Sequence, residues 1–310
     1  MTVINRSKRR VKDPTSKLIS AEHYYDNQAE NYDKACYYTE STGYYPANWY
    51  RLELTKKIIE QRISPGSTVL DAGCGTGEIL VHLLEKGHQA SGCDLSQKMI
   101  DVGRRKLESR HLTAEITKTS LEDLQMYKSN SFDAVLAMGV FPYIREERDA
   151  ACLAEIHRVL RPKGLFVSAH ENELFDLFTF NKYTLRFFER NIYPLLRQVA
   201  PTASLKKLKS QMATLIRNPE EPKSVDPLKA PRDVIFTKPE NPLTYGDKIK
   251  ALGFELERLE YYHFHALPPL LRNGDRQLMQ MSKQMEGRFS ASWQGAFLAS
   301  TFIAISHKMG

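Results

Sequence analysis

The stretch Val69–Leu80, VLDAGCGTGEIL, decides the fold. It starts in an apolar run, continues with an acid and three glycines between residues 71 and 77, and then becomes apolar again. This order predicts a buried strand, a tight turn and the first turn of a helix. Glycines at such a turn allow positive φ and let backbone N–H groups approach a ligand closely. The stretch therefore predicts a binding site for a small ligand.

Strands and helices alternate outward from this stretch. Strand patterns occur at 68–72, 89–94, 114–118, 132–138 and 165–169, and helix patterns occur near 77–86, 97–108 and 147–160. Strands separated by helices predict βαβ units, hence an α/β fold with a parallel sheet and right-handed crossovers.

The rest of the chain divides into segments around this core. We expect a disordered basic arm at 1–18, a core with aromatic-rich entrance helices at 19–170, a cap or substrate insertion at 171–243, and completion of the sheet at 244–310. In that last segment the pattern predicts helices near 244–252 and 275–286, and strands at 254–264 and 296–307.

Composition and charge narrow the function classes. Hydrophobic residues make up 42% and charged residues 26% of 310 residues, and no apolar run approaches a membrane span of ~20 residues. Four cysteines without CxxC spacing favour free thiols, a cytoplasmic protein and no metal site. The net charge is +7, with +5 in residues 1–17, +4 in 205–232 and so −2 elsewhere. A basic excess confined to a tail and an insertion favours a solvated surface, and no nucleic-acid partner is expected.

The acids around the glycines define the ligand. No lysine follows Gly77, as a phosphate-binding P-loop requires, and the glycines fall as GxGxG rather than GxGxxG. Asp71 just before the loop repels phosphates and attracts a cation. Asp94 ends the next strand, where a carboxylate can accept both ribose hydroxyls. A ribose, a positive charge and no phosphate describe S-adenosylmethionine.

Four motifs in this order and spacing resemble the class I S-adenosylmethionine-dependent methyltransferases of the small-molecule branch: VLDAGCGTG, SGCDLSQKMI, SFDAVLAMGVFPYI and RVLRPKGLFV. The resemblance covers roughly residues 20–170 and the last two strands. It implies a seven-stranded, mostly parallel Rossmann-like sheet with helices on both faces and an antiparallel last strand. The insertion then follows the fifth strand as a helical cap.

The resemblance also assigns roles around the donor. The positions that match the family's motifs are the loop under the methionine portion (Gly73, Gly75, Gly77), the acid near its amino group (Asp71), the ribose acid (Asp94), the adenine neighbours (Leu95, Met99), and the end of the fourth strand (Met138). Ser120, followed by Leu121, stands where the family usually has an aspartate for the adenine amine. Tyr24, Tyr25 or Tyr32 is expected to cover the sulfonium, where an aromatic face is favourable.

Three histidines near strand ends are the candidate catalytic bases. His170 follows the fifth strand, and His263 and His265 alternate at the end of the sixth. A hydroxyl acceptor needs such a base, whereas an amine only needs to lose its proton beforehand. Tyr143 or Tyr262 could serve instead, and the histidines could also simply tie the cap to the sheet. A third metal ligand is not evident from the spacing, so no metal is expected.

The sequence thus favours a methyltransferase acting on a hydroxyl or amine of a polar small molecule: a sugar, a polysaccharide precursor or a specialised metabolite. The alternative is an RNA or protein methyltransferase that docks through its basic arm and insertion. A binding protein without turnover is the third reading, against which the intact glycines and acids argue. Nothing in the sequence indicates the oligomeric state.

Overall fold

The computed structural model describes residues 18–37, 46–216, 234–271 and 276–310. The predicted basic arm, apart from Leu18, and the proline-rich part of the insertion at 217–233 lie outside the described residues.

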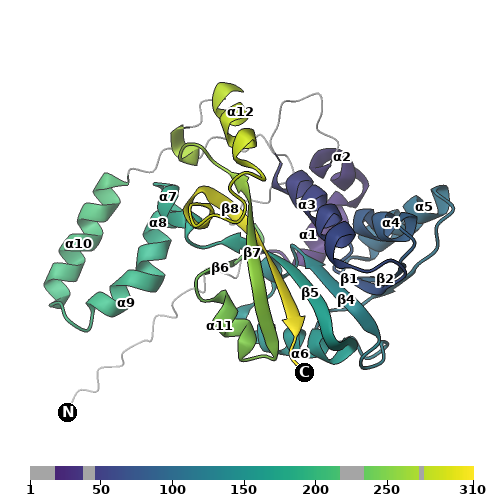
Figure 1. Cartoon of the computed structure of the whole chain (residues 1–310). Helices are drawn as coiled ribbons and strands as arrows, with labels where there is room; N and C mark the ends of the chain where they lie inside the picture. The colour runs from purple at the N-terminus through teal and green to yellow at the C-terminus, as the bar shows by residue number, and fades with distance from the viewer. Residues whose placement is uncertain (1–17, 38–45, 217–233, 272–275) are drawn as a thin grey trace, which may run out of the picture.

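The strands form one mixed sheet in the order β3-β2-β1-β4-β5-β8-β7, with β6 paired to β5 (Figure 1). All pairings are parallel except those of β8, which runs antiparallel to both β5 and β7. The strands are β1 Thr68–Ala72, β2 Gln89–Asp94, β3 Glu115–Lys118, β4 Phe132–Met138, β5 Leu160–Asn172, β6 Pro239–Glu240, β7 Phe254–Phe264 and β8 Ala299–Lys308.

This arrangement confirms the predicted α/β class and differs in strand count. Seven strands were expected and the described residues form eight, because Pro239 and Glu240 of the expected insertion pair with Glu171 and Asn172 at the end of β5. The last strand also begins later than its apolar run predicts. Residues 295–298 are helical, and a Cβ at Gly295 would lie 2.6 Å from the ring of Tyr261.

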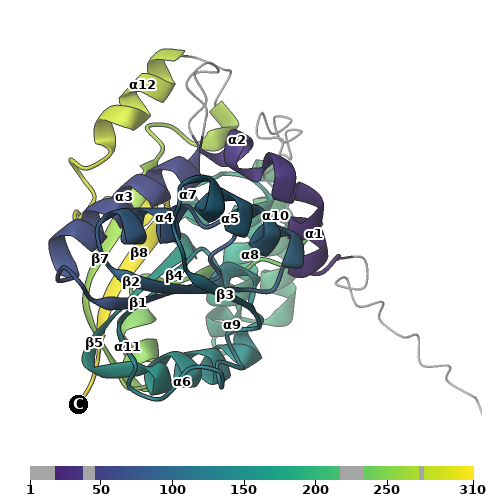
Figure 2. The ribbon, with the colours of Figure 1, turned by 90° about the vertical axis from the view of Figure 1, so that its right-hand side faces the viewer.

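Helices cover both faces of the sheet, as Figure 2 shows. On one face α3 and α4 contribute Ile58, Ile59 and Leu83 to a buried cluster with Val69 and Val167 of the sheet. On the other face, α6 and α11 pack against Phe166 and Phe254. These helices are α3 Ala47–Arg62, α4 Glu78–Glu85, α5 Gln97–Ser109, α6 Asp149–Val159 and α11 Tyr245–Lys250.

The remaining helices lie at the carboxyl ends of the strands or beyond them. Before β1 the chain forms α1 Ala21–Gln28, η2 Ala29–Asn31 and α2 Tyr32–Cys36, and between β4 and β5 it forms η3 Phe141–Tyr143 and η4 Glu146–Arg148. Between β5 and β6 it forms α7 Phe175–Phe178, α8 Lys182–Phe187, η5 Phe188–Ile192, α9 Tyr193–Leu196 and α10 Thr202–Leu215. Between β7 and β8 it forms η6 Pro269–Leu271, α12 Arg276–Met285 and α13 Gly295–Leu298. Helices α8, α9 and α10 form a hairpin that projects from the sheet (Figure 1).

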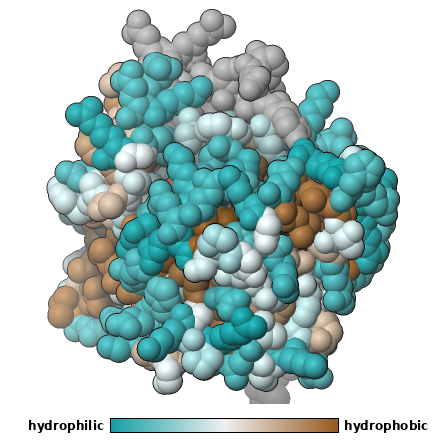
Figure 3. All heavy atoms as spheres, turned by 45° about the vertical axis from the view of Figure 1, so that its right-hand side comes forward, coloured by the Kyte–Doolittle hydropathy of each residue, from teal (hydrophilic) through white to brown (hydrophobic). Residues whose placement is uncertain are grey.

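The surface is mostly hydrophilic on the face drawn in Figure 3, with hydrophobic residues showing between the hydrophilic ones. No helix among the described residues is long and apolar enough to cross a membrane.

Candidate active site

A cavity of about 170 Å³ lies at the carboxyl ends of β1, β2 and β4. Most of the donor residues that the sequence predicts line it. From the strand ends and the glycine loop these are Gly73, Gly75, Asp94, Leu95 and Met138, and from the surrounding elements Tyr32, Met99, Ser120 and Leu121. Asp71 and Gly77 are not in its wall: Asp71 is buried in β1, and Gly77 caps α4.

The glycine loop takes a shape that other residues would not allow. Gly73 has φ +83°, and a Cβ there would collide with the side chain of Val140. The backbone N–H groups of Gly73 and Cys74 donate to the carbonyl oxygen of Cys93, at 2.7 and 2.9 Å. The loop is therefore fixed against β2, and its bare backbone forms part of the cavity wall.

Asp94 is held in the cavity wall by two backbone donors. Gly75 N donates to its Oδ2 at 2.9 Å, and Ser96 N donates to its Oδ1 at 2.8 Å. Burial raises the pKa of Asp94, while these hydrogen bonds oppose the rise. Each carboxylate oxygen keeps a second lone pair, so both can still accept a hydroxyl from a ligand.

Asp71 lies beneath the loop without any compensating contact. Its exposed fraction is 1%, and neither carboxylate oxygen has a hydrogen-bond partner among the described residues. Burial, and then the charge of Asp94, raise its pKa to about 8. A buried carboxyl group without a partner favours a cation bound nearby.

The N-terminal helices close one side of the cavity. Tyr25 and Tyr32 line it, and the ring centroid of Tyr25 lies 5.4 Å from that of Tyr143, another lining residue. Tyr24 packs against Tyr25 and does not line the cavity. Of the three predicted covering tyrosines, two therefore lie where a donor would be covered.

Arg51 of α3 is a lining residue that the sequence analysis missed. Its guanidinium lies against the backbone of Gly139, where a Cβ would come within 2.5 Å of Nη1 and φ is +84°. Burial lowers the pKa of Arg51, but surrounding tyrosines, Tyr262 first, raise it above its usual value. No carboxylate of the described residues forms an ion pair with it. Nothing in the local sequence distinguishes this arginine from others on an exposed helix face.

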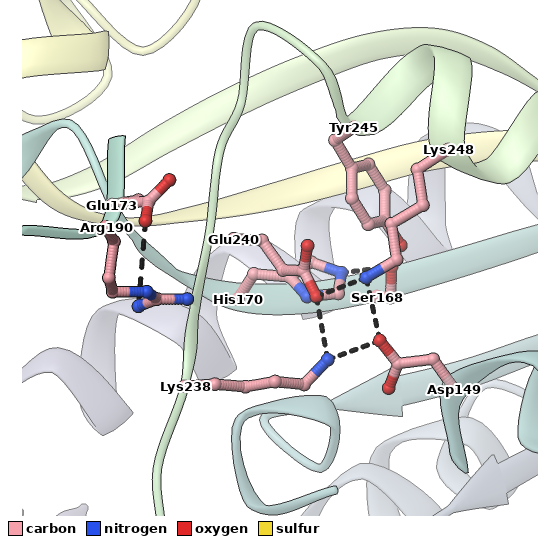
Figure 4. A network of polar contacts seen from close by, with 9 residues as sticks. All are labelled: Asp149, Ser168, His170, Glu173, Arg190, Lys238, Glu240, Tyr245 and Lys248. Atoms are coloured by element: carbon pink, nitrogen blue, oxygen red, sulfur yellow. Dashed lines mark hydrogen bonds and ion pairs between the residues drawn. The ribbon is translucent and has the colours of Figure 1, made fainter. Parts of the chain in front are cut away.

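The candidate base His170 lies in the hydrophobic core, outside the cavity wall. Its exposed fraction is 2%, its ring stacks on Phe302 at 5.2 Å, and Nε2 shares a hydrogen bond of 2.8 Å with Ser168 Oγ. Burial lowers its pKa to about 3. A neighbouring cluster of alternating charge, Asp149, Lys238, Glu240 and Lys248, joins α6 to β6 and α11 (Figure 4).

His263 and His265 lie together, as their spacing predicts, but also outside the cavity wall. Their ring centroids are 4.6 Å apart, and His263 Nδ1 shares a hydrogen bond of 2.6 Å with Ser300 Oγ. His265 packs on Phe175 of α7. A catalytic role for the three histidines stays a prediction, and in this structure their contacts connect strands and helices. Among the residues the structure describes, no cluster of His, Cys, Asp and Glu could hold a metal ion.

Comparison with known proteins agrees with this geometry. Residues 69–164 match the family model described as "Methyltransferase domain". These residues include the glycine loop, Asp94, Ser120 and Met138. The chain carries a class I S-adenosylmethionine-dependent methyltransferase domain. The small-molecule branch of that family stays a prediction.

Relatives of this methyltransferase domain resemble the chain over part of their length. A demethylmenaquinone methyltransferase of Symbiobacterium thermophilum is 30% identical over 171 residues, which is 53% of this chain and 64% of that protein. The chain spans about half the length of three other curated relatives that it matches.

Two solved structures share the fold over most of the chain. A complex of the Haloferax volcanii Trm112 methyltransferase activator with a putative methyltransferase has a TM-score of 0.54 at 16% identity, and covers 92% of this chain and 98% of that one. The [4+2]-cyclase SpnF has a TM-score of 0.55 at 16% identity, with coverage of 93% and 94%. Since these names include a cyclase, the fold alone does not decide the reaction.

Proposed function

We propose that this protein transfers a methyl group from S-adenosylmethionine to a hydroxyl or amine of a polar small molecule, such as a sugar, a polysaccharide precursor or a specialised metabolite. The observation that carries the proposal is the placement of Asp94 and Arg51 in the wall of one cavity, on opposite sides of the glycine loop. The strand order β2-β1-β4 separates them, because Asp94 ends β2 and Arg51 lies on the backbone just after β4. A ligand with a diol at one end and an amino-acid carboxylate at the other matches this pair.

Each group has a distinct part in holding such a donor. Asp94 accepts hydrogen bonds from the ribose hydroxyls, and Arg51 pairs with the carboxylate. A bound ammonium or sulfonium would stabilise the ionised form of the buried Asp71 carboxyl group, and Tyr25 and Tyr32 present aromatic faces to a cation. The bound donor supplies an activated methyl group, so the protein's task is to align the acceptor with it and to exclude water.

Among the described residues that line the cavity, none is a free base apart from Asp94, whose proposed part is to accept the ribose hydroxyls. Burial raises the pKa of both Tyr25 and Tyr143, so their hydroxyls stay protonated at neutral pH. The carboxylates of Glu22 and Glu122 are ion-paired with Lys118 and Arg148. An acceptor that brings its own nucleophile, a neutral amine or an acidic hydroxyl, suits this wall best.

Donor binding tests the first half of the proposal. Titration calorimetry should show binding of S-adenosylmethionine and S-adenosylhomocysteine. Asp94→Ala removes the diol acceptor and should weaken both by about 1–3 kcal/mol. Arg51→Gln should also weaken both, because the carboxylate loses its cation. Asp247→Ala, at an exposed acid outside the cavity, is the matched control. Unchanged affinity in both cavity variants would contradict the assignment.

Methyl transfer is tested separately, with donor labelled on the methyl group. The protein is incubated with cell extract divided into small molecules, RNA and protein, and the label should appear in the small-molecule fraction. Label in RNA or protein would support the alternative function instead. Donor binding without transfer to any fraction would leave the donor site in place and refute the transfer reaction.

A further inference from the structure

The helical hairpin of residues 182–215 has a strongly positive net charge. It holds one acid, Glu189, and seven basic residues: Lys182, Arg186, Arg190, Arg197, Lys206, Lys207 and Lys209. Its net charge is therefore 7 − 1 = +6, against +7 for the whole protein. This hairpin comprises α8, η5, α9 and α10 and stands out from the sheet (Figure 1). A charge this concentrated creates a positive potential on one projection of the molecule.

The hairpin's own structure uses only some of these cations. Lys209 lies 4.8 Å from the ring centroid of Tyr193 and 3.7 Å from Glu189, so it connects α10 to η5 and α9. Arg190 pairs with Glu173 at 3.6 Å. Arg197, Lys206 and Lys207 are exposed and form no ion pair with any residue that the structure describes. Hairpin residues are also absent from the wall of the donor cavity.

Two large apolar side chains are exposed beside these cations. Leu195 in α9 is 61% exposed, and Val199, in the turn before α10, is 82% exposed. Arg197 lies between them in the sequence. Burial of either side chain in an apolar phase would be favourable, and nothing in the described fold covers them.

We propose that this hairpin docks the protein on an anionic lipid surface. Unpaired lysine and arginine side chains attract acidic headgroups, and adjacent exposed apolar residues insert at the boundary of headgroups and acyl chains. A polyanion such as RNA would satisfy the cations but would leave Leu195 and Val199 in water, so the lipid surface accounts for more of the observations. No described helix is long and apolar enough to span a membrane, and the proposal concerns binding to the surface alone. This inference does not depend on the reaction.

Sedimentation with vesicles tests the proposal on the full chain. The protein should bind vesicles of phosphatidylcholine and phosphatidylglycerol in equal parts and bind pure phosphatidylcholine vesicles much more weakly. Binding should fall steeply as salt is raised, because the attraction of exposed charges is screened. Equal binding to both vesicle types, or binding to neither, would overturn the proposal.

A triple variant, Arg197→Gln, Lys206→Gln and Lys207→Gln, locates the surface. Each basic residue near an anionic membrane contributes roughly fivefold in affinity, so the triple variant should bind on the order of 100-fold more weakly. The matched control, Lys57→Gln, Lys128→Gln and Lys250→Gln, removes the same charge from exposed positions of the body and should retain binding. Both proteins must show the wild-type circular dichroism spectrum. Equal loss in the two triple variants would refute a local docking surface.

A tryptophan at the tip distinguishes lipid from RNA. The emission of Val199→Trp should shift to the blue on addition of the anionic vesicles and should not shift with RNA. Leu243→Trp, which is exposed outside the hairpin, should stay unshifted with both. A hairpin-dependent affinity for RNA that exceeds the affinity for vesicles, with no blue shift at residue 199, would replace the lipid by RNA as the partner.

Discussion

At the scale of single residues, the site combines groups whose burial costs free energy as long as no ligand is bound. Asp71 is buried with no hydrogen-bond partner among the described residues, and Arg51 is surrounded by tyrosines. Neither arrangement improves the stability of the free protein, since burying an uncompensated charge costs free energy. Such groups are common where a charged ligand restores the balance.

Asp71 makes the stability of the ligand-free protein depend on pH. Its folded-state pKa of about 8 lies above the unfolded value, so the folded state binds more protons between these values and stability falls as pH rises through that window. Asp71→Asn does not titrate. In urea denaturation at pH 5, 7 and 9, the free energy of unfolding of the variant should increase relative to that of the wild type as pH rises. The relative increase should be on the order of 5 kcal/mol over the window. Parallel curves for the two proteins would contradict the raised pKa of Asp71.

His170 offers a test of the histidine hypothesis. With a pKa of about 3 and a place among Phe141, Tyr245 and Phe302, its ring stays neutral across pH 6–9. We expect His170→Phe to preserve turnover and its pH profile, measured with the acceptor that the fractionation identifies. If His170 were the general base, turnover of the variant would fall by a factor of about 10²–10⁴ with unchanged donor affinity. The same comparison applies to His263→Ala and His265→Ala, with melting temperature as the control for folding.

At the scale of elements, the helices around the cavity are held by charges at their edges. The segment of α1, η2 and α2 presents four acids to the core: Glu22 to Lys118, Asp26 to Ser96, Glu30 to Arg105 and Asp33 to Lys106. Tyr25 and Tyr32 of the same segment line the cavity. The polar contacts of these four acids thus determine how firmly Tyr25 and Tyr32 are held at the cavity.

Asp33 should govern how fast the donor leaves. Its contacts with Thr76 and with Lys106, at 2.6 Å, are partly buried, whereas the pair of Glu30 and Arg105 is exposed. Asp33→Asn should therefore speed donor dissociation several-fold in stopped-flow measurements. Glu30→Gln is the matched control and should change little, because exposed ion pairs contribute about 0–1 kcal/mol. Equal donor dissociation rates in both variants would show that the contacts of Asp33 do not hold the N-terminal helices over the cavity.

The charge cluster of Figure 4 fastens β6 and α11 to α6. Lys238 pairs with Asp149 and Glu240, and its backbone N–H donates to Pro142 O in the segment that bounds the cavity. Lys238→Met leaves the buried Asp149 and the partly buried Glu240 with Lys248 alone and should cost about 3–5 kcal/mol in urea unfolding. Adding Glu240→Gln to this variant should recover part of the loss. A double variant no more stable than Lys238→Met would contradict the charge imbalance.

At the scale of the whole molecule, the donor cavity and the helical hairpin are separate features of one sheet. The cavity lies where β1, β2 and β4 end, and the hairpin follows β5. The sequence predicts the insertion at 171–243 as a cap over the donor, whereas the cavity wall comes from the N-terminal helices and the core in the part of the chain that the structure describes. Closure of the insertion stays a prediction.

Hydrogen exchange measures that closure. Addition of S-adenosylhomocysteine should slow exchange in residues 18–37, because Tyr25 and Tyr32 lie in the cavity wall. If the insertion closes as well, exchange in residues 171–216 slows in parallel. Slowing confined to the N-terminal helices would show that the insertion is not a cap. Residues 245–250 of α11, none of which lines the cavity, serve as an internal reference.

Local sequence was sufficient for most of the fold. The expected strands at 68–72, 89–94, 132–138 and 254–264 match β1, β2, β4 and β7 in the structure. Their boundaries follow from alternation of apolar residues and from glycine turns, which depend on neighbouring residues only. The extra strand β6 was not predictable, because two residues acquire strand geometry only by pairing with β5.

The sequence by itself determined much of the cavity wall, because Gly73, Gly75, Asp94 and Met138 lie at or next to strand ends and the fold brings parallel strand ends together. Their roles toward the donor stay a prediction. Tertiary structure alone decided the rest. Arg51 reaches the cavity because α3 packs beside the turn after β4, and Gly139 leaves room for its guanidinium. His170 is turned into the core, because the side of β5 on which it lies is covered by Phe141 and Tyr245. Which face of a strand is covered depends on packing between distant segments, and no local pattern contains that information.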